Sequence, residues 1–238
     1  MRFALIPLLA FATGACAMPP ASTKPAVQVS PATTAEQAGL VDVATLAPDL
    51  HVEMRYAGSD NFTGAPVPGY EANTCLLLRP AAEALAAVQA ELRPQGLSLQ
   101  IFDCYRPVRA VKVFVAWARD LSDQRGKPEH YPNLDKSQLL GPYIAETSGH
   151  SRGATVDLSL LRCAAQGCAP LDMGTGFDLF DPRANTDAPE INAAQRENRR
   201  HLLDAMQRHG FANYPLEWCH YTFKPEPTPA TAYDVTVR

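Results

Sequence analysis

Residues 148–161 read SGHSRGATVDLSLL and contain two sets of side chains that could carry out chemistry. Residues 149–153 fit G-x-S-x-G, the nucleophile elbow in which a serine, here Ser151, attacks a carbonyl carbon. His150 and Asp157 could instead be two ligands of a metal ion. The two chemistries make different demands on the rest of the chain, so the surrounding sequence can discriminate between them.

A nucleophile elbow requires an apolar strand before the serine and a helix after it. The preceding residues, GPYIAETS, contain few β-branched apolar side chains and are interrupted by Glu146. The following residues, TVDLSLL, alternate as a strand does. Asp178 and His220 could complete a catalytic triad with Ser151. Because the flanking residues do not fit a nucleophile elbow, a serine hydrolase that uses Ser151 is the weaker alternative.

The metal interpretation requires a third ligand and a separate base. A catalytic zinc ion takes three protein ligands, usually histidine or carboxylate, and keeps one position open. Glu217-Trp218-Cys219-His220 offers His220 as the third ligand, beside His150 and Asp157. In a flat strand Glu217 and His220 would face opposite sides, so we expect a bulge or turn that brings both to one site. Glu217 would then be the general base.

The elements that would position these residues indicate an α+β protein. We expect helices in RPAAEALAAVQAELRPQG, in VRAVKVFVAWARD and over residues 193–209, and strands in LSLQIFDC, TVDLSLL and LEWCHYTF. Helices and strands do not alternate strictly as in a parallel α/β fold. The sequence therefore predicts a single domain with a mostly antiparallel central sheet flanked by helices.

Composition limits the partners. The chain has 238 residues, 46% of them hydrophobic, which is typical of a soluble globular domain with a substantial core. The net charge is -4 and the sequence has no basic run, so we expect no nucleic-acid partner. Nothing in the sequence predicts a protein partner.

The N-terminus carries an export signal. Arg2 precedes ALIPLLAFA, an apolar run too short to span a bilayer, so residues 1–15 are predicted to be a signal peptide. TGAC resembles a lipobox that would lipidate Cys16, while ACA also fits ordinary signal cleavage. We favour the lipoprotein, because residues 16–39 are rich in Pro, Ala, Ser and Thr and are predicted to be a disordered tether before a catalytic domain at residues 40–238. We therefore expect an exported protein, either periplasmic or anchored to the membrane.

Cysteine use agrees with export. Apart from the candidate lipidation site, five cysteines remain, and this odd number predicts two disulfides and one free thiol in an oxidising compartment. Cys163 and Cys168 flank a tight polar loop, Cys75 with Cys104 is the next pairing, and Cys219 is left free. Zinc binding by cysteines is disfavoured because the chain has no C-x-x-C pair.

The motifs together resemble those of a known family. SGHSRGATVDLSL followed by EWCHYTF resembles the signature pair of the D-Ala-D-Ala dipeptidases, the VanX-type branch of the zinc DD-peptidases. The resemblance continues in RYAGSDNFTG, FDCYRPVRAV, LDMGTGFDLFD and NRRHLLDAM, in the family's order. It extends from about residue 41 to the end of the chain.

This resemblance implies a role for each candidate catalytic residue. His150, Asp157 and His220 would hold one zinc ion, and Glu217 would be the catalytic base. Arg106 matches the arginine that polarises the scissile carbonyl and stabilises the oxyanion, a task that suits its permanently charged, planar guanidinium.

The resemblance also implies how the two ends of a dipeptide are bound. Ser148 would lie near the substrate carboxylate and Asp178 near its ammonium group, with Tyr56 as a further candidate for the ammonium end. The chain departs from the family pattern at one position of the EWCHYTF motif. The family usually has two tryptophans between the glutamate and the histidine, whereas this chain has Trp218 followed by Cys219. The inserted loop CAAQGC is a second departure, and both could alter substrate preference.

The expected activity is therefore zinc-dependent hydrolysis of D-Ala-D-Ala to two D-alanines in cell-wall peptide metabolism. A zinc DD-carboxypeptidase or endopeptidase acting on peptidoglycan stem peptides is the alternative within the same chemistry. A non-catalytic wall-binding lipoprotein is the alternative from another class, and the presence of Glu217 argues against it.

Overall fold

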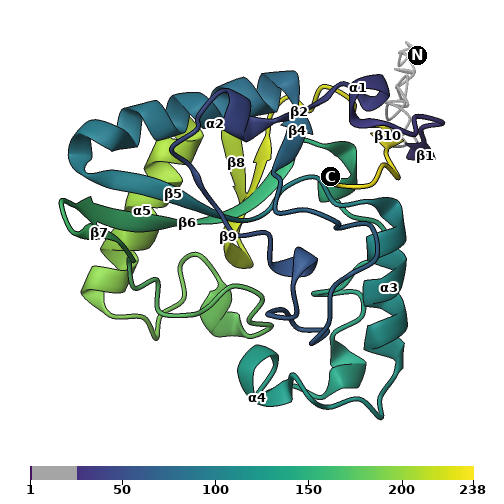
Figure 1. Cartoon of the computed structure of the whole chain (residues 1–238). Helices are drawn as coiled ribbons and strands as arrows, with labels where there is room; N and C mark the ends of the chain where they lie inside the picture. The colour runs from purple at the N-terminus through teal and green to yellow at the C-terminus, as the bar shows by residue number, and fades with distance from the viewer. Residues whose placement is uncertain (2–25) are drawn as a thin grey trace.

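The structure is a computed structural model that describes Met1 and residues 26–238 (Figure 1). The predicted signal peptide and Cys16 lie outside the described residues. Within the described part, no helix has the length and apolar character needed to cross a bilayer.

The core of the fold is a six-stranded sheet with the order β3-β5-β6-β9-β8, in which β7 also pairs with β6. Its strands are β3 (His51–Val52), β5 (Leu97–Asp103), β6 (Thr155–Ala164), β7 (Gly167–Pro170), β8 (Phe211–Tyr214) and β9 (Glu217–Phe223). Only β3 and β5 run parallel, while the remaining pairs are antiparallel. The prediction of an α+β domain with a mostly antiparallel sheet is confirmed.

Two long helices back this sheet. Helix α2 (Arg79–Leu92) and helix α5 (Ala193–Arg208) contact each other, α2 also contacts β5, and α5 contacts β6 and β8 (Figure 1). Their apolar residues join one continuous core with the alternating residues Val156, Leu158 and Leu160 of β6. That alternation leaves the opposite face of β6, which carries Asp157, free to form the site.

A helical and looped region lies beside the sheet. Helix α3 (Val108–Arg119) begins directly after Pro107, and the single turn of α4 (Lys127–His130) follows it (Figure 1). The apolar residues of α3 include Phe114 and Trp117, whose rings contact Phe62. This aromatic cluster supports the wall of the pocket described below.

Two small two-stranded sheets lie outside the central sheet. Strands β2 (Leu40–Asp42) and β4 (Leu76–Leu78) are antiparallel, whereas β1 (Gln28–Val29) pairs in parallel with β10 (Thr231–Ala232). A short helix, α1 (Ala35–Ala38), lies between β1 and β2.

The predicted boundary of the folded domain was therefore wrong over residues 26–39. Thr34 caps α1, and Gly39 ends the helix in the left-handed conformation with a φ of 71°. Strand β1 finds its partner more than 200 residues further along the chain, at Thr231 and Ala232. Because that pairing is long-range, the local composition could not indicate it.

The predicted disulfides are confirmed. Cys75 is bonded to Cys104, which joins the start of β4 to the end of β5. Cys163 and Cys168 are cross-strand partners in the hairpin of β6 and β7 and form the second bond. Cys219 is free and buried.

Candidate metal centre and active site

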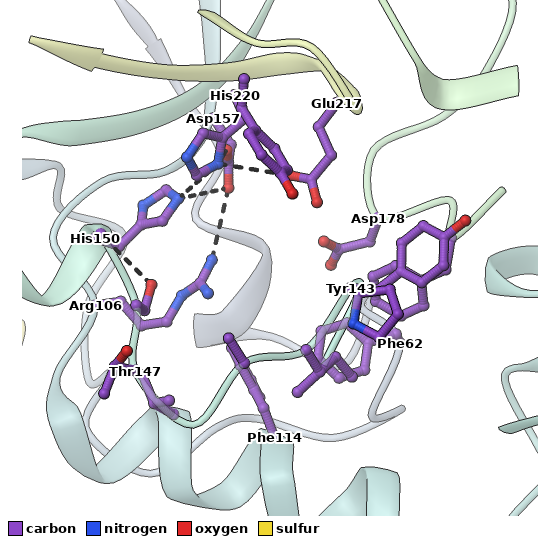
Figure 2. Close-up of a pocket in the computed structure, with 18 of the residues that line it drawn as sticks. Phe62, Arg106, Phe114, Tyr143, Thr147, His150, Asp157, Asp178, Glu217 and His220 are labelled. Atoms are coloured by element: carbon purple, nitrogen blue, oxygen red, sulfur yellow. Dashed lines mark hydrogen bonds and ion pairs between the residues drawn. The ribbon is translucent and has the colours of Figure 1, made fainter. Parts of the chain in front are cut away.

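The three predicted metal ligands converge on one point (Figure 2). Asp157 and His220 face each other across β6 and β9, with His220 Nδ1 3.0 Å from Asp157 Oδ1. His150 lies on a 3-10 turn before β6, and its Nε2 atom is 3.2 Å from Asp157 Oδ2 and 3.3 Å from His220 Nδ1. One candidate ligand atom from each residue lies within 4.8 Å of the other two.

The bonds around this cluster fit a metal ion. His150 Nδ1 donates to the carbonyl of Cys104 at 2.7 Å, so the unprotonated Nε2 faces the cluster. Asp157 Oδ1 is buried and accepts no hydrogen bond from the described residues. Burial alone would raise the pKa of Asp157, but the two neighbouring imidazoles lower it far below its usual range. Two imidazoles and an ionised carboxylate are a donor set typical of catalytic zinc.

A second group of possible ligands lies elsewhere on the described surface. His51 is near Cys163 and Cys168, whose sulfur atoms are bonded to each other. Cysteine binds a metal ion as the thiolate, so these two sulfur atoms are not thiolate ligands while the disulfide persists. The cluster around Asp157 is therefore the candidate catalytic centre.

Glu217 lies beside the cluster because β9 is irregular where the strand begins. Asn213 of β8 pairs with Tyr221, but the next residue, Tyr214, pairs with Glu217, so the register shifts as a bulge requires. Glu217 Oε2 is consequently 3.5 Å from His220 Nδ1. Burial raises the pKa of the Glu217 carboxyl, partly offset by His220, which favours a group that can both accept and release a proton.

Arg106 enters the site from the turn between β5 and α3. Its Nη2 atom is 2.8 Å from Asp103 Oδ2 and 3.6 Å from Asp157 Oδ2. Its guanidinium carbon lies 5.2 Å from the ring centroid of Tyr56 and 5.0 Å from that of Phe114. The side chain is thus held between a carboxylate and two aromatic faces, which fixes where its charge points.

Asp103 is a functional residue that sequence reasoning missed. It is fully buried, and its Oδ1 accepts hydrogen bonds from Tyr70 OH at 2.8 Å and from Cys104 N at 2.9 Å. Its Oδ2 binds Arg106 and lies 3.5 Å from His150 Nδ1. The available signal was that Asp103 is the one charged residue of β5, at the end of the strand.

Asp178 lies across the pocket from His150 (Figure 2). The hydroxyl of Tyr56 lies 3.0 and 2.9 Å from the two carboxylate oxygens of Asp178 and donates to that carboxylate. Burial raises the pKa of the Asp178 carboxyl well above its usual range, and the charge of Asp157 adds to the effect. A cationic group entering the pocket would favour the ionised form of Asp178.

The loop that carries Asp178 is held by a buried arginine of α5. Arg199 donates from Nε to Met173 O at 2.7 Å, from Nη1 to Asn185 O at 2.6 Å and from Nη2 to Arg183 O at 3.0 Å. Within the described residues, none of its hydrogen-bond partners is a carboxylate, and burial lowers the pKa of Arg199 to about 10. One side chain therefore connects both ends of the loop.

All the predicted site residues line one cavity of about 250 Å³: Tyr56, Arg106, Ser148, His150, Asp157, Asp178, Glu217 and His220. Ser148 contributes to the wall near His150, and its Oγ accepts the main-chain N–H of His150 at 3.2 Å. Aromatic side chains complete the wall, among them Phe62, Phe114, Tyr143 and Tyr214. The cavity is small and has a charged or metal-binding group at each end.

The structure does not support the alternative with Ser151 as a nucleophile. Ser151 is 2% exposed, and its Oγ has no hydrogen-bond partner in the described part of the chain. A serine nucleophile requires an adjacent base to take its proton. Ser151 is instead part of the turn that carries the candidate ligand His150, where the Ser151 carbonyl accepts the N–H of Tyr233 at 2.8 Å.

The chain is similar to known proteins over most of its length. Residues 36–238 match the family Peptidase_M15, described as D-Ala-D-Ala dipeptidase. The D-alanyl-D-alanine dipeptidase of Streptomyces coelicolor is 42% identical over 196 residues, covering 82% of this chain and 96% of that protein. The D-alanyl-D-alanine dipeptidase of Enterococcus faecium is 38% identical, covering 78% and 92%, and that of Escherichia coli is 34% identical, covering 76% and 83%.

A solved structure is more distantly similar. A point mutant of the D,D-pentapeptidase VanY from a VanB-type vancomycin-resistance cassette, in complex with Zn(II), aligns with 66% of this chain and 78% of its own. The TM-score is 0.39 and the sequence identity is 15%. Family membership follows from the match over residues 36–238 and from the relatives above 30% identity: the chain belongs to the Peptidase_M15 family of D-Ala-D-Ala dipeptidases.

Proposed function

We propose that the protein hydrolyses D-Ala-D-Ala to two D-alanines with one zinc ion held by His150, Asp157 and His220. The observation that carries the proposal is the convergence of these three side chains at one end of a small cavity, with Asp178 at the other end. Family membership supports the same activity.

The residues around the ion divide the chemistry between them. When bound, zinc supplies Lewis-acid activation of water and of the scissile carbonyl. Glu217 lies next to His220, so it can take a proton from the attacking water and deliver it to the leaving amine. Arg106 keeps its charge at every relevant pH and stabilises the oxyanion as it develops.

The two ends of the substrate find different partners. The Asp178 carboxylate, oriented by Tyr56, pairs with the ammonium group, and the wall near Ser148 receives the carboxylate. A cavity of about 250 Å³ with partners at both ends favours a free dipeptide. A longer or blocked peptide brings no ammonium to Asp178 and leaves a buried carboxyl group without its partner.

The test is incubation of the purified, zinc-loaded protein with D-Ala-D-Ala and, separately, with a pentapeptide that ends in D-Ala-D-Ala. We expect rapid release of D-alanine from the dipeptide and little from the pentapeptide. Preferential cleavage of the pentapeptide would assign the protein to the DD-carboxypeptidases instead.

We further propose that the protein works outside the cytoplasm, with Cys16 as the site of a lipid anchor. The two disulfides, Cys75–Cys104 and Cys163–Cys168, support an oxidising compartment. Labelling cells with a radioactive fatty acid tests the anchor: the wild-type chain should take up label and the Cys16→Ser chain should not. An unlabelled wild-type chain in the soluble periplasmic fraction would support ordinary signal cleavage.

A further inference from the structure

The backbone of Asp178 lies in the left-handed region, which few residues other than glycine adopt. Its φ is 57°, and it is the only non-glycine residue with positive φ in the described part of the chain. Such a residue persists only where neighbouring contacts hold it, and such residues are frequent at functional sites. Tyr56 bonds to the Asp178 carboxylate, and the main-chain carbonyl of Asp178 has a partner of its own.

His130, the last residue of α4, contacts the main chain of this loop at two points. Its Nδ1 atom is 3.1 Å from the carbonyl oxygen of Asp178. Its own carbonyl accepts the N–H of Phe180 at 2.7 Å. The segment 178–180 is therefore tied to His130 by one side-chain bond and one main-chain bond. Asn133 continues the connection, because its Nδ2 donates to Asp181 Oδ2 at 2.7 Å.

The protonation of His130 suits this contact. A carbonyl oxygen only accepts hydrogen bonds, so Nδ1 of His130 carries the proton. Burial lowers the pKa of His130, which favours the neutral ring with this single proton at pH 7. The ring is further held edge-on to Phe62, with the two centroids 6.5 Å apart.

His130 is outside the catalytic cavity. It lines a neighbouring cavity of about 370 Å³, together with Phe177 and Trp218. It therefore does not touch a substrate bound between Asp157 and Asp178, and any effect on the reaction must pass through the residues that His130 contacts, which are segment 178–180 and Phe62.

We propose that His130 is a positioning residue for recognition of the substrate ammonium group. His130 donates a hydrogen bond to the Asp178 carbonyl and so holds Asp178 in the left-handed conformation. In that conformation the Asp178 carboxylate points toward Tyr56 and the cavity. The inference rests on the proposed function, because it assumes that Asp178 binds the substrate amine.

The kinetic test compares His130→Ala with His130→Asn. The alanine removes the donor, and we expect KM for D-Ala-D-Ala to rise about three- to tenfold, the range of one net hydrogen bond, with kcat within about twofold of wild type. The asparagine amide can donate to the same carbonyl, so it should restore most of the loss. His201→Ala is the matched control, because His201 bonds to Gln95. An unchanged KM in folded, zinc-loaded His130→Ala protein would overturn the proposal.

A double-mutant cycle separates positioning from general destabilisation. In an Asp178→Asn background, His130→Ala should change KM by less than about twofold, because the carboxylate that it positions has already been removed. Equal effects of His130→Ala in both backgrounds would contradict the proposal.

A crystal structure of the His130→Ala protein decides the question without catalysis. We expect Asp178 to leave its left-handed conformation or to lose its bond with Tyr56. Retention of both would overturn the positioning role even if the enzyme cleaves D-Ala-D-Ala. Conversely, a wild-type protein that does not cleave the dipeptide would overturn the proposed function and leave this structural test in force.

Discussion

Asp157 and His220 are direct partners across two antiparallel strands, and their side chains meet on the same face of the sheet. The backbone ladder therefore sets the spacing of two of the three proposed metal ligands. A shift of one residue in the register of β6 and β9 would place the ligands on opposite faces. The pairing of β6 and β9 thus fixes the relative positions of Asp157 and His220, while His150 joins them from the turn before β6.

The first prediction concerns metal content. His220→Ala removes one of three ligands, so we expect most of the zinc to be lost when the protein is measured by elemental analysis after dialysis. His201→Ala, which lies on α5, should keep the wild-type content. If the His220→Ala protein keeps the wild-type stoichiometry, the ligand assignment is wrong.

The second prediction concerns the general base. Glu217→Gln keeps the size of the side chain but cannot accept a proton, so kcat should fall by about 10²- to 10⁴-fold while zinc content stays the same. Steady-state kinetics with D-Ala-D-Ala and parallel metal analysis provide the measurement. Wild-type kcat in this variant would show that another group is the base.

The third prediction concerns Ser151. Because its hydroxyl has no partner among the described residues and lies away from the cavity lining, Ser151→Ala should retain most of the activity. Turnover of D-Ala-D-Ala by the purified variant is the measurement. A folded, zinc-loaded variant without activity would revive the serine nucleophile.

The fourth prediction concerns the amino end of the substrate. N-acetyl-D-Ala-D-Ala cannot pair with Asp178, so its kcat/KM should be lower than that of the free dipeptide by a factor equivalent to about 2–5 kcal/mol. Asp178→Asn should narrow this gap, mainly by losing activity on the free dipeptide. Similar kcat/KM values for both substrates in the wild type would mean that the pocket is open at this end.

The fifth prediction compares the two disulfides. Chain-entropy estimates assign about 3.6 kcal/mol of stability to a bond that closes 29 residues and about 2 kcal/mol to one that closes 5, the separations of Cys75–Cys104 and Cys163–Cys168. Urea unfolding of the two double-alanine variants measures this difference.

The disulfide of Cys104 should also influence the metal. The Cys104 carbonyl orients His150, so loss of the Cys75–Cys104 bond should weaken zinc binding in competition with a chelator. The Cys163→Ala/Cys168→Ala protein is the matched control and should bind zinc as the wild type does. Equal zinc affinity in both variants would restrict the first disulfide to a role in stability.

Much of this site could be predicted because its residues carry local signals. The alternation of TVDLSLL assigned Asp157 to the face opposite Val156 and Leu158, as the structure has it. The spacing in EWCH required a bulge, and the register of β8 and β9 contains one. Residue type and motif order were sufficient to pick out the side chains that the structure brings together, namely His150, Asp157, His220 and Glu217.

What the sequence could not indicate depends on contacts between distant segments. His130 belongs to a four-residue helix without a distinctive motif, and its contact with Asp178 exists only after residues 48 positions apart come together. Asp103 looks like an ordinary strand end until Arg106, Tyr70 and His150 surround it. The pairing of β1 with β10 is the same kind of long-range event, and for that reason the domain boundary was misplaced.

Arg199 has a role in the Asp178 loop that resembles the role of a structural calcium ion in other proteins. Its positive charge is surrounded mainly by main-chain oxygens, and these oxygens come from segments that are distant in the sequence. This cation is part of the chain, so a chelator that removes the catalytic metal leaves it in place. The metal-free enzyme should therefore keep the amino-binding wall of its pocket assembled. The proposed metal chemistry would thus depend on a removable ion, whereas the proposed recognition of the amine would depend on a cation that belongs to the chain.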